Sequence, residues 1–484
     1  MVNVRSVKFN FLMNLILTSS NFLFPLIIFP YISRVLLPEG TGKVAFATSI
    51  ITYFTIIAGF GVSNYGVRAI AQIRENREQL TKTTQEILSI NILCMILAYV
   101  MLFMGLYFVQ ELNKEFILLS IMSLSIFFSI IGVEWFYKGV EQYKYITVRS
   151  LFFKLISLGL VFLFVNDQED YTVFGAITIF SIIASGILNF LNLRKFLFLR
   201  VYDAYDFKRH IRPMFILFLS GFAIAIYTNI DATLLGFLVN NEEVGYYNAA
   251  IKIKGVLLTF VTSLGIVLLP RLSYYIHNGM DNEFRMMLNK SMNFIFLISI
   301  PISVFFIVFA DAVILILAGE NYLASIFPLK IVMLTIIFIG VTNILGVQVM
   351  LPLGKDFQFL LSVLVGAIVN ISLNLFLIPK YLSVGTSIAT TIAEFIVLLV
   401  QCLFLRAYFV ILFKNISYIK ILLSVFVSIY ISMVFNDLIH VDFLLWRVCI
   451  VGVVFGLFYF LSLFVLRERF VVEAFGFVKN KLNR

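Results

Sequence analysis

The sequence predicts an all-α membrane protein that crosses the bilayer many times, on three observations. Of its 484 residues, 61% are hydrophobic and 13% are charged, whereas about a quarter of the residues in a soluble domain are charged. Apolar runs of about 20 residues, long enough to span a bilayer as helices, recur along the whole chain. Lysine and arginine concentrate in every second connecting segment. Unpaired backbone groups are costly in hydrocarbon, so these runs should be helices.

About fourteen runs qualify as transmembrane spans. The first follows Arg5 and Lys8, and it is too long for a signal peptide and lacks a small-residue cleavage site, so we expect a retained helix. The expected spans are 11–32, 44–62, 87–109, 116–137, 146–165, 172–193, 213–238, 245–269, 292–317, 326–350, 358–379, 384–405, 420–436 and 445–466.

The basic residues predict the orientation of the chain, because lysine and arginine are retained on the cytoplasmic side. With the N-terminus inside, most of the 36 basic residues fall on cytoplasmic segments, and the outer loops "NDQEDY", "NNEEVG" and "NDLIHVD" are acidic. Both termini should then be cytoplasmic. The net charge of +10 is accounted for by this asymmetry and by attraction to anionic membrane lipids, without a nucleic-acid partner.

An internal repeat predicts how the helices are grouped. "LLPEGTGKVAFATSI" with "GFGVSNYGVRAIAQ" resembles "LLGFLVNNEEVGYYNAAIKI" with "SLGIVLLPRLSYYI", and both Gly42/Gly245 and Arg68/Arg271 match at an offset of 203 residues. We therefore expect two six-helix lobes related by a pseudo-twofold axis along the membrane normal, an arrangement found in secondary transporters. The expected divisions are an N-terminal lobe 1–193, a cytoplasmic interlobe linker 194–212, a C-terminal lobe 213–410, and two further helices with a cytoplasmic tail in 411–484.

The connecting segments leave no room for a soluble catalytic domain. Segment 63–86 could form an interfacial helix, and 194–213 should lie along the cytoplasmic surface; either could instead be a plain solvated or lipid-contacting connector. The three cysteines and three histidines are widely separated and indicate neither a disulfide framework nor a zinc site nor a catalytic group. We therefore expect a protein that is not an enzyme and has no cofactor or bound metal.

Ionisable residues inside the spans are the candidate functional residues, because such groups are costly in the bilayer and usually face protein or a wet cavity. Asp231 and Lys252 should lie level on consecutive helices, each roughly 10 Å below the outer interface, and could form a structural ion pair. Lys252 and Lys254 project about 200° apart, so at most one of them pairs with Asp231.

Other charged residues could add to the same cavity. Arg34 and Lys154 could supply positive charge or could snorkel to an interface. Glu134 and Lys138 have the i, i+4 spacing of a structural helical ion pair. Glu394 has no partner in its own span and could be protonated or coupled to an ion, whereas Asp311 and Lys330 should be solvated.

A cavity with surplus lysine and arginine suits an anionic substrate such as a phosphate. Tyrosines near these charges could stack on sugar rings, although each is also an ordinary membrane-interface anchor. They are Tyr31, Tyr53, Tyr65, Tyr227, Tyr246 and Tyr247.

Two segments resemble a known family. "PYISRVLLPEGTGKVAFATSIITYFTIIAGFGVSNYGVRAIA" at 30–71 and "NIDATLLGFLVNNEEVGYYNAAIKI" at 229–253 resemble the Wzx-type polysaccharide flippases of the multidrug/oligosaccharidyl-lipid/polysaccharide (MOP) exporter superfamily. The motif separates the superfamily from other transporters better than it separates members within it.

The resemblance implies a two-lobe transporter in the bacterial cytoplasmic membrane that moves an undecaprenyl-diphosphate-linked oligosaccharide, the repeat unit of O-antigen or capsule, to the outer leaflet by alternating access. A polysaccharide polymerase and a chain-length regulator are partners that it suggests. Arg34, Arg68, Asp231, Lys252 and Lys254 fall in the matching segments.

Three alternatives remain open. A cation-coupled multidrug antiporter of the same superfamily commonly uses an acidic residue in its first helix, and span 1 here has none. A lipid II flippase would use nearly the same physics. A membrane-embedded polymerase or glycosyltransferase would need a sizeable outer loop with acid and base residues, which the sequence lacks. The glycan, the coupling ion and the oligomeric state are not encoded in any motif.

Overall fold

The computed structural model describes residues 6–198, 200–406, 413, 416–439, 441 and 443–472. All regular elements in these ranges are helices, and eleven of them are long and apolar enough to cross a membrane. The all-α, polytopic fold class is therefore confirmed, whereas the count of fourteen spans stays a prediction. By their internal contacts the residues form two units, Met1–Gly245 and Tyr246–Arg484. The expected lobe limits at 193 and 213 stay a prediction.

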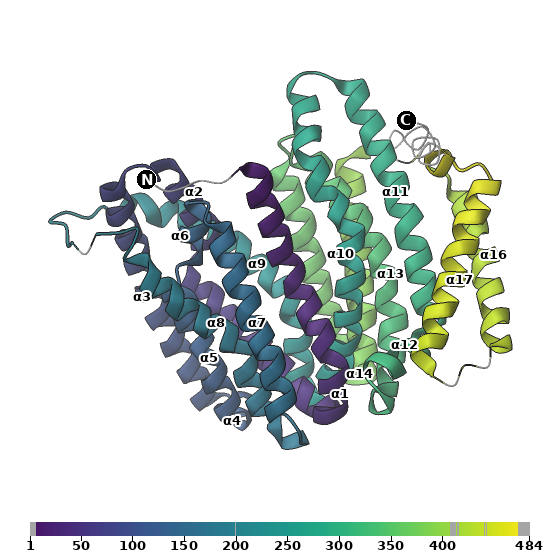
Figure 1. Ribbon diagram of the computed structural model, residues 1–484, viewed down its shortest axis with the longest axis horizontal. Helices are drawn as coiled ribbons and strands as arrows, with labels where there is room; N and C mark the ends of the chain where they lie inside the picture. The colour runs from purple at the N-terminus through teal and green to yellow at the C-terminus, as the bar shows by residue number, and fades with distance from the viewer. Residues whose placement is uncertain are drawn as a thin grey trace. The chain divides into compact units, whose positions relative to one another are not determined.

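Unit 1 contains nine α-helices, one 3-10 turn and the first residues of a tenth α-helix among the residues described (Figure 1). Their bounds are α1 Val7–Gly59, α2 Val62–Ile73, α3 Arg77–Phe108, α4 Gln110–Lys114, α5 Phe116–Ile131, α6 Glu134–Gly139, α7 Tyr143–Phe164, η1 Gln168–Asp170, α8 Tyr171–Leu193, α9 Lys208–Leu238 and α10 Asn241–His277.

Helix α1 is sharply kinked where the sequence analysis expects a loop between two spans. Leu37 has φ 57° and ψ −179° inside the helix, and Pro38 follows it. Proline lacks a backbone donor and crowds the preceding turn, so the hydrogen-bond ladder breaks at this point. The expected loop 33–43 is therefore wrong in form, because a single kinked residue separates the two halves of α1.

Three other boundaries also differ from the expected ones. Helix α3 begins at Arg77, ten residues before the expected span, because Asn76 caps it by accepting bonds from Glu78 N and Gln79 N. The expected span 116–137 is interrupted after α5, where Val133 adopts φ 40°. Helix α9 begins at Lys208, so the last residues of the expected linker 194–212 are helical. The expected interfacial helix in 63–86 is present as α2.

Unit 2 contains the rest of α10 and the later helices (Figure 1). Their bounds are α11 Asp281–Val308, α12 Ala310–Leu317, η2 Glu320–Ser325, α13 Ile326–Asn343, the π-helix η3 Ile344–Met350, α14 Asp356–Phe404, α16 Tyr418–Leu438 and α17 Leu444–Val465. Helix α14 contains a kink at Leu382, φ 53°, between the expected spans 358–379 and 384–405.

The two C-terminal helices are fixed to α11 by a buried polar network. Glu468 is fully buried, and its Oε1 accepts bonds from Asn293 Nδ2 at 2.9 Å and Ser417 Oγ at 3.1 Å. Apolar packing of Leu297 with Tyr459 and Leu463 continues the contact. Helices α16 and α17 are therefore a packed part of unit 2.

Polar and apolar side chains are distributed as expected for a protein in lipid. On α3, Leu93 is 68% exposed, whereas Asn91 is buried and donates to Gly59 O at 2.8 Å. Large apolar side chains on the surface and satisfied polar groups inside suit a hydrocarbon solvent, in which an unpaired polar group is costly.

Candidate functional site

Lys154 lies in the middle of α7 and is held by polar side chains of α1. Its Nζ donates to Ser20 Oγ at 2.7 Å and to Asn21 Oδ1 at 2.6 Å, and it lies 5.9 Å from the centre of the Phe24 ring. Asn21 is exposed, whereas Ser20 is buried. Because the ammonium is bound at the level of Ser20, Lys154 does not snorkel to an interface. It remains a candidate substrate contact.

The three expected cationic residues of unit 1 lie at different levels and do not form one cluster. Arg34 is exposed near the kink of α1 and donates to Pro30 O at 2.6 Å. Thirteen residues of helix separate it from Asn21, which corresponds to about 20 Å. Arg68 is exposed on α2, 5.9 Å from the centre of the Tyr65 ring. Any role in binding would therefore require successive rather than simultaneous contacts.

A second polar group lies on α6 and α7. Glu134 and Lys138 form the helical ion pair that their spacing predicts, with 2.8 Å between Oε1 and Nζ. Arg149 lies 3.9 Å from Glu134 and donates to the Asn189 side chain of α8. The sequence analysis placed Arg149 in a cytoplasmic segment, but it is only 7% exposed. Its one available signal was a position on the same helix as Lys154.

Asp231 lies on α9 beside a hydroxyl seam that joins α9 to the second half of α1. Asp231 is 6% exposed. Two residues further on, Thr233 Oγ1 contacts Tyr53 Oη at 3.2 Å and donates to Ser49 Oγ at 3.0 Å. Asp231 belongs to unit 1 and Lys252 to unit 2, so their expected pairing stays a prediction.

Unit 2 holds the remaining candidates. Lys252 and Lys254 are half-buried on α10, and Glu394 is 8% exposed on the second half of α14. Tyr247 Oη and Thr390 Oγ1 are 3.1 Å apart, which places α10 beside that part of α14. Lys252 follows Tyr247 by five residues and Glu394 follows Thr390 by four, about 7.5 and 6 Å along the respective helices.

Asp311 and Lys330 are nearer to each other than the sequence analysis assumed. Lys330 Nζ lies 3.4 Å from Asp311 Oδ2, and the two side chains are 31% and 58% exposed. They form a surface ion pair between α12 and α13, and exposed pairs of this kind contribute little to stability.

The two glycines that match in the internal repeat lie against each other. A Cβ atom on Gly42 would collide with the carbonyl group of Asn241 and lie 2.8 Å from the nitrogen of Gly245. A Cβ atom on Gly245 would collide with the carbonyl group of Pro38 and lie 3.0 Å from its Cα. Only glycine permits this backbone-to-backbone crossing of α1 and the first turn of α10.

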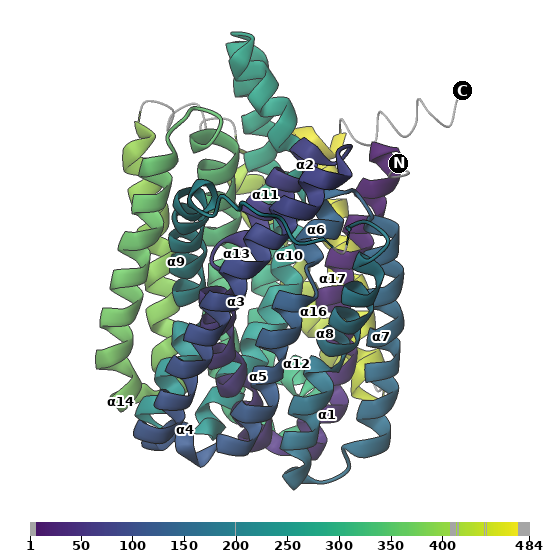
Figure 2. The same ribbon diagram turned by 90° about the vertical axis from the view of Figure 1, so that its left-hand side faces the viewer.

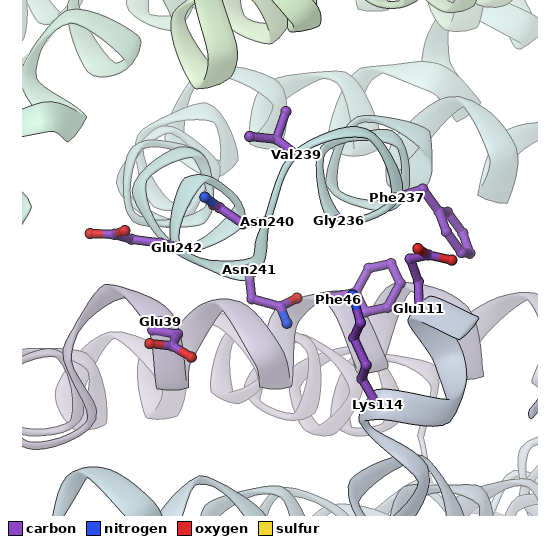
Figure 3. A pocket seen from close by; sticks show the side chains of 10 residues that line it. All are labelled: Glu39, Phe46, Glu111, Lys114, Gly236, Phe237, Val239, Asn240, Asn241 and Glu242. Carbon is purple, nitrogen blue, oxygen red and sulfur yellow. The ribbon is translucent and has the colours of Figure 1, made fainter. Parts of the chain in front are cut away.

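A pocket of about 320 Å³ opens beside this crossing (Figure 3). Phe46 and Gly236 form its apolar wall, and the turn between α9 and α10 borders it. Its polar residues are Glu39 of α1, Glu111 and Lys114 of α4, and Asn240, Asn241 and Glu242 at the turn. The rim has more carboxylates than ammonium groups, so the pocket does not suit a diphosphate.

The segment 194–207, which we call the strap, is bound along the first turns of α3 (Figure 2). Arg77 donates to the carbonyl oxygens of Lys195, Phe196 and Leu197 at 3.0 to 3.3 Å. Further along α3, Gln85 donates to Arg200 O at 2.9 Å. The strap therefore contacts protein along its length, and the interpretation of 194–213 as a plain connector is wrong.

The strap ends at a buried carboxylate. Glu86 is fully buried, and its Oε1 accepts a bond from Asp206 N at 2.8 Å. Its Oε2 lies 2.5 Å from Arg209 Nη2 and 2.8 Å from His210 Nε2. Tyr65 Oη lies 2.7 Å from His210 Nδ1, so a proton on Nε2 allows Tyr65 to donate to Nδ1. This latch fixes the start of α9 to α2 and α3, and no sequence motif indicated it.

No group of three or more His, Cys, Asp and Glu side chains capable of holding a metal occurs in the described part of the chain.

Comparisons with known proteins agree with this architecture. The chain is 23% identical over 407 residues to an Escherichia coli (strain K12) protein named "Putative O-antigen transporter", covering 84% of this chain and 98% of that one. It superposes on a structure of the lipid II flippase MurJ with TM-score 0.75 and 16% identity, covering 95% and 100% of the two chains. An inward-facing multidrug MATE transporter of the MOP superfamily gives TM-score 0.62 and 14% identity over 84% and 99%.

The two structural likenesses show a shared fold. A family model described as "Polysaccharide biosynthesis protein" matches residues 7–276, more than half of the chain. The chain therefore belongs to the polysaccharide biosynthesis protein family of polytopic membrane transporters.

Proposed function

We propose that the protein moves an undecaprenyl-diphosphate-linked oligosaccharide from the inner to the outer leaflet of the bacterial cytoplasmic membrane by alternating access. The named relative is an O-antigen transporter by its title, and the MurJ structure is that of a lipid II flippase. Both names refer to saccharide-bearing substrates, which supports the same substrate class for this chain.

The observation that supports the proposal most directly is the pair of lysines on α10. Lys252 and Lys254 are half-buried in an otherwise apolar helix. An ionised group inside the bilayer costs about 2.5–3.5 kcal/mol on insertion scales, so two of them two residues apart indicate a function. Ammonium groups are good donors to phosphate oxygens, and we assign them the diphosphate.

Glu394 is proposed to adjust the charge of this site. In the predicted topology both α10 and the second half of α14 run from the outer to the inner face. Because Tyr247 and Thr390 are in contact, Lys252 and Glu394 would then lie at similar depth. A carboxylate there reduces the charge of the site, which helps the diphosphate to leave as well as to bind.

Lys154, Arg34 and Arg68 are proposed as contacts at successive levels of the path. Lys154 has its ammonium beside the exposed Asn21, a polar edge that a sugar hydroxyl or a phosphate oxygen could join. The different levels of these three cations suit a long substrate that is passed along, better than one that is held at a single point.

A multidrug antiporter is the second candidate, since a MATE structure shares the fold. The first half of α1 has no Asp or Glu, and the polar groups of the described part of that half contact Lys154 and Arg34 instead. A cationic drug is disfavoured by these positive charges.

The test replaces Lys252 and Lys254 by Ala, singly and together, in a cell that depends on this protein for surface polysaccharide. A charge-assisted hydrogen bond contributes about 1.5–3 kcal/mol, so we expect export to fall about tenfold or more in the double variant. Lys330→Ala, in the surface pair with Asp311, is the matched control and should export normally. Full export by both single variants and the double variant, at equal protein levels, would rule out the assignment.

A further inference from the structure

Glu115, between α4 and α5, is a buried carboxylate that the proposed transport path does not use. It is 6% exposed. Asn241, the first residue of α10, donates from Nδ2 to Glu115 Oε1 at 3.4 Å. Asn241 is also the residue whose carbonyl group packs against Gly42. The Glu115–Asn241 contact therefore adjoins the glycine crossing.

Two acceptor atoms at this contact are buried without a donor. Among the residues that the structure describes, neither Glu115 Oε2 nor Asn241 Oδ1 has a hydrogen-bond partner. A buried acceptor left unpaired costs about 1–3 kcal/mol. The two atoms belong to the two side chains that the Nδ2 to Oε1 bond already joins, so one proton on Oε2 could be donated to Oδ1 and satisfy both.

The charges around Glu115 also favour a neutral carboxyl. Lys43 of α1 is the nearby cation, and its Nζ is already paired with Glu39 Oε1 at 2.9 Å. With Glu39 and Glu115 both ionised, these three groups would have a net charge of −1; a proton on Glu115 makes them neutral. The surrounding titratable groups are Glu39 and Lys43 from α1, Glu111 and Lys114 from α4, Tyr171 from α8 and Glu242 from α10.

Burial raises the pKa of Glu115 above its ordinary value, Lys43 opposes this shift and Glu39 adds to it. Undocking of α10 would expose the carboxyl to water and restore its ordinary pKa. A group whose pKa is higher in the docked state stabilises that state at low pH. The stabilisation is lost as the pH rises through the raised value.

We propose that Glu115 is a proton-binding site that is occupied while the first turn of α10 is docked on α1 at the Gly42–Gly245 crossing, and that loss of the proton releases the turn. The ligand is a single proton, bound as a carboxylic acid paired with the Asn241 amide. Its relevance to transport rests on the proposed function, in whose orientation this end of unit 1 faces outward and α10 also holds Lys252 and Lys254.

The occupancy of the site is tested by infrared difference titration of the full chain in lipid vesicles, without any transported substrate. We expect a protonated-carboxyl C=O band that persists above the ordinary glutamic acid range and that is lost in Glu115→Gln. The amide of that variant keeps both hydrogen bonds to Asn241, so it should fold. Glu111→Gln, on the rim of the same pocket, is the matched control and should keep the band. A band unchanged by Glu115→Gln would overturn the proposal.

The release of α10 is tested with a thiol at Val239, beside the crossing, after replacement of Cys94, Cys402 and Cys449 by Ala. Maleimide labelling rates are compared at each pH between chains with and without Glu115→Gln, so that thiol ionisation cancels in the ratio. We expect a ratio near one at low pH that rises with pH by at most about tenfold per unit, the limit for one proton. A ratio independent of pH would overturn the proposal.

These two measurements need no sugar-lipid substrate, so they are independent of the proposed function. If they succeed while the lysine variants export normally, the proton site stands and the substrate assignment fails. If the lysine variants lose export while both measurements fail, the reverse holds.

Discussion

Gly42 and Gly245, which occupy equivalent positions in the internal repeat, contact each other's helices reciprocally. Gly42 packs on Asn241, and Gly245 packs on Pro38. Pro38 and Asn241 are themselves 203 residues apart, the same offset as the two glycines. Contacts of the kind i to j and j to i are those that a twofold axis produces. The kink at Leu37 and the break between α9 and α10 also occupy corresponding positions of the repeat.

The crossing predicts a large difference between two glycines of α10. Gly245→Ala places a methyl group on the backbone of Pro38, and we expect a loss of about 1–3 kcal/mol of stability from overpacking. Gly255→Ala is the control, because a Cβ atom there meets nothing within 4 Å. It should gain up to about 1 kcal/mol from helix propensity. Thermal unfolding in detergent measures both, and equal melting temperatures would contradict the close approach.

Lys154 offers a separation of stability from transport. Lys154→Met removes a buried charge and leaves Ser20 and Asn21 with shorter polar networks; replacing buried charges by apolar groups is often neutral or stabilising. We expect an unchanged or higher melting temperature together with reduced polysaccharide export. Lys154→Arg, which keeps the charge, should retain part of the export. A variant that loses stability and export in proportion would instead show that Lys154 is structural.

The latch predicts a strong dependence on one buried carboxylate. Glu86→Gln leaves Arg209 without its counter-charge; because that side chain is 47% exposed, we expect a loss of about 1–3 kcal/mol, below the range for a fully buried pair. Glu78→Gln is the matched control on the same helix. Its pair with Arg200 is 4.0 Å long and exposed, so the change should be within about 0.5 kcal/mol. Denaturant titration of both variants decides between them.

The strap depends on Arg77 geometry as well as charge. Arg77 bonds three successive carbonyl groups and lies 4.3 Å from the centre of the Phe198 ring. A lysine cannot reproduce these contacts, because it lacks the planar guanidinium fork. We expect Arg77→Lys to increase chymotryptic cleavage in 194–207 severalfold, whereas Lys82→Arg, which has no such carbonyl contacts among the described residues, should leave cleavage unchanged.

The helices were predictable because their signal is local. Runs such as 146–165 and 172–193 correspond closely to α7 and α8, since hydrocarbon requires every spanning segment to satisfy its own backbone. Chain breaks were predicted less well. Whether Pro38 produces a kink or a loop depends on what packs against it, and Asn76 and Val133 set helix ends through caps and φ angles that hydropathy does not encode.

The candidate site was predictable only as a set of residue types. The sequence identifies Lys154, Asp231, Lys252, Lys254 and Glu394 as ionisable residues in apolar segments, and it separates Lys252 from Lys254 by helix geometry. It does not reveal the burial of Arg149, the latch at Glu86 or the paired orphan acceptors of Glu115 and Asn241. Each of these depends on residues more than 30 positions apart, and no single-sequence pattern reports such distances.

By itself, the sequence determined that this protein is a helical membrane transporter, because composition and apolar run length respond to the solvent, and the bilayer is uniform along the chain. It also determined the repeat that matches Gly42 with Gly245. Only the tertiary structure decided that these glycines touch, that Lys154 is bound at the level of Ser20, and that Glu115 faces Asn241. Those facts depend on close packing between distant segments, where tenths of an ångström decide whether a side chain or a proton fits.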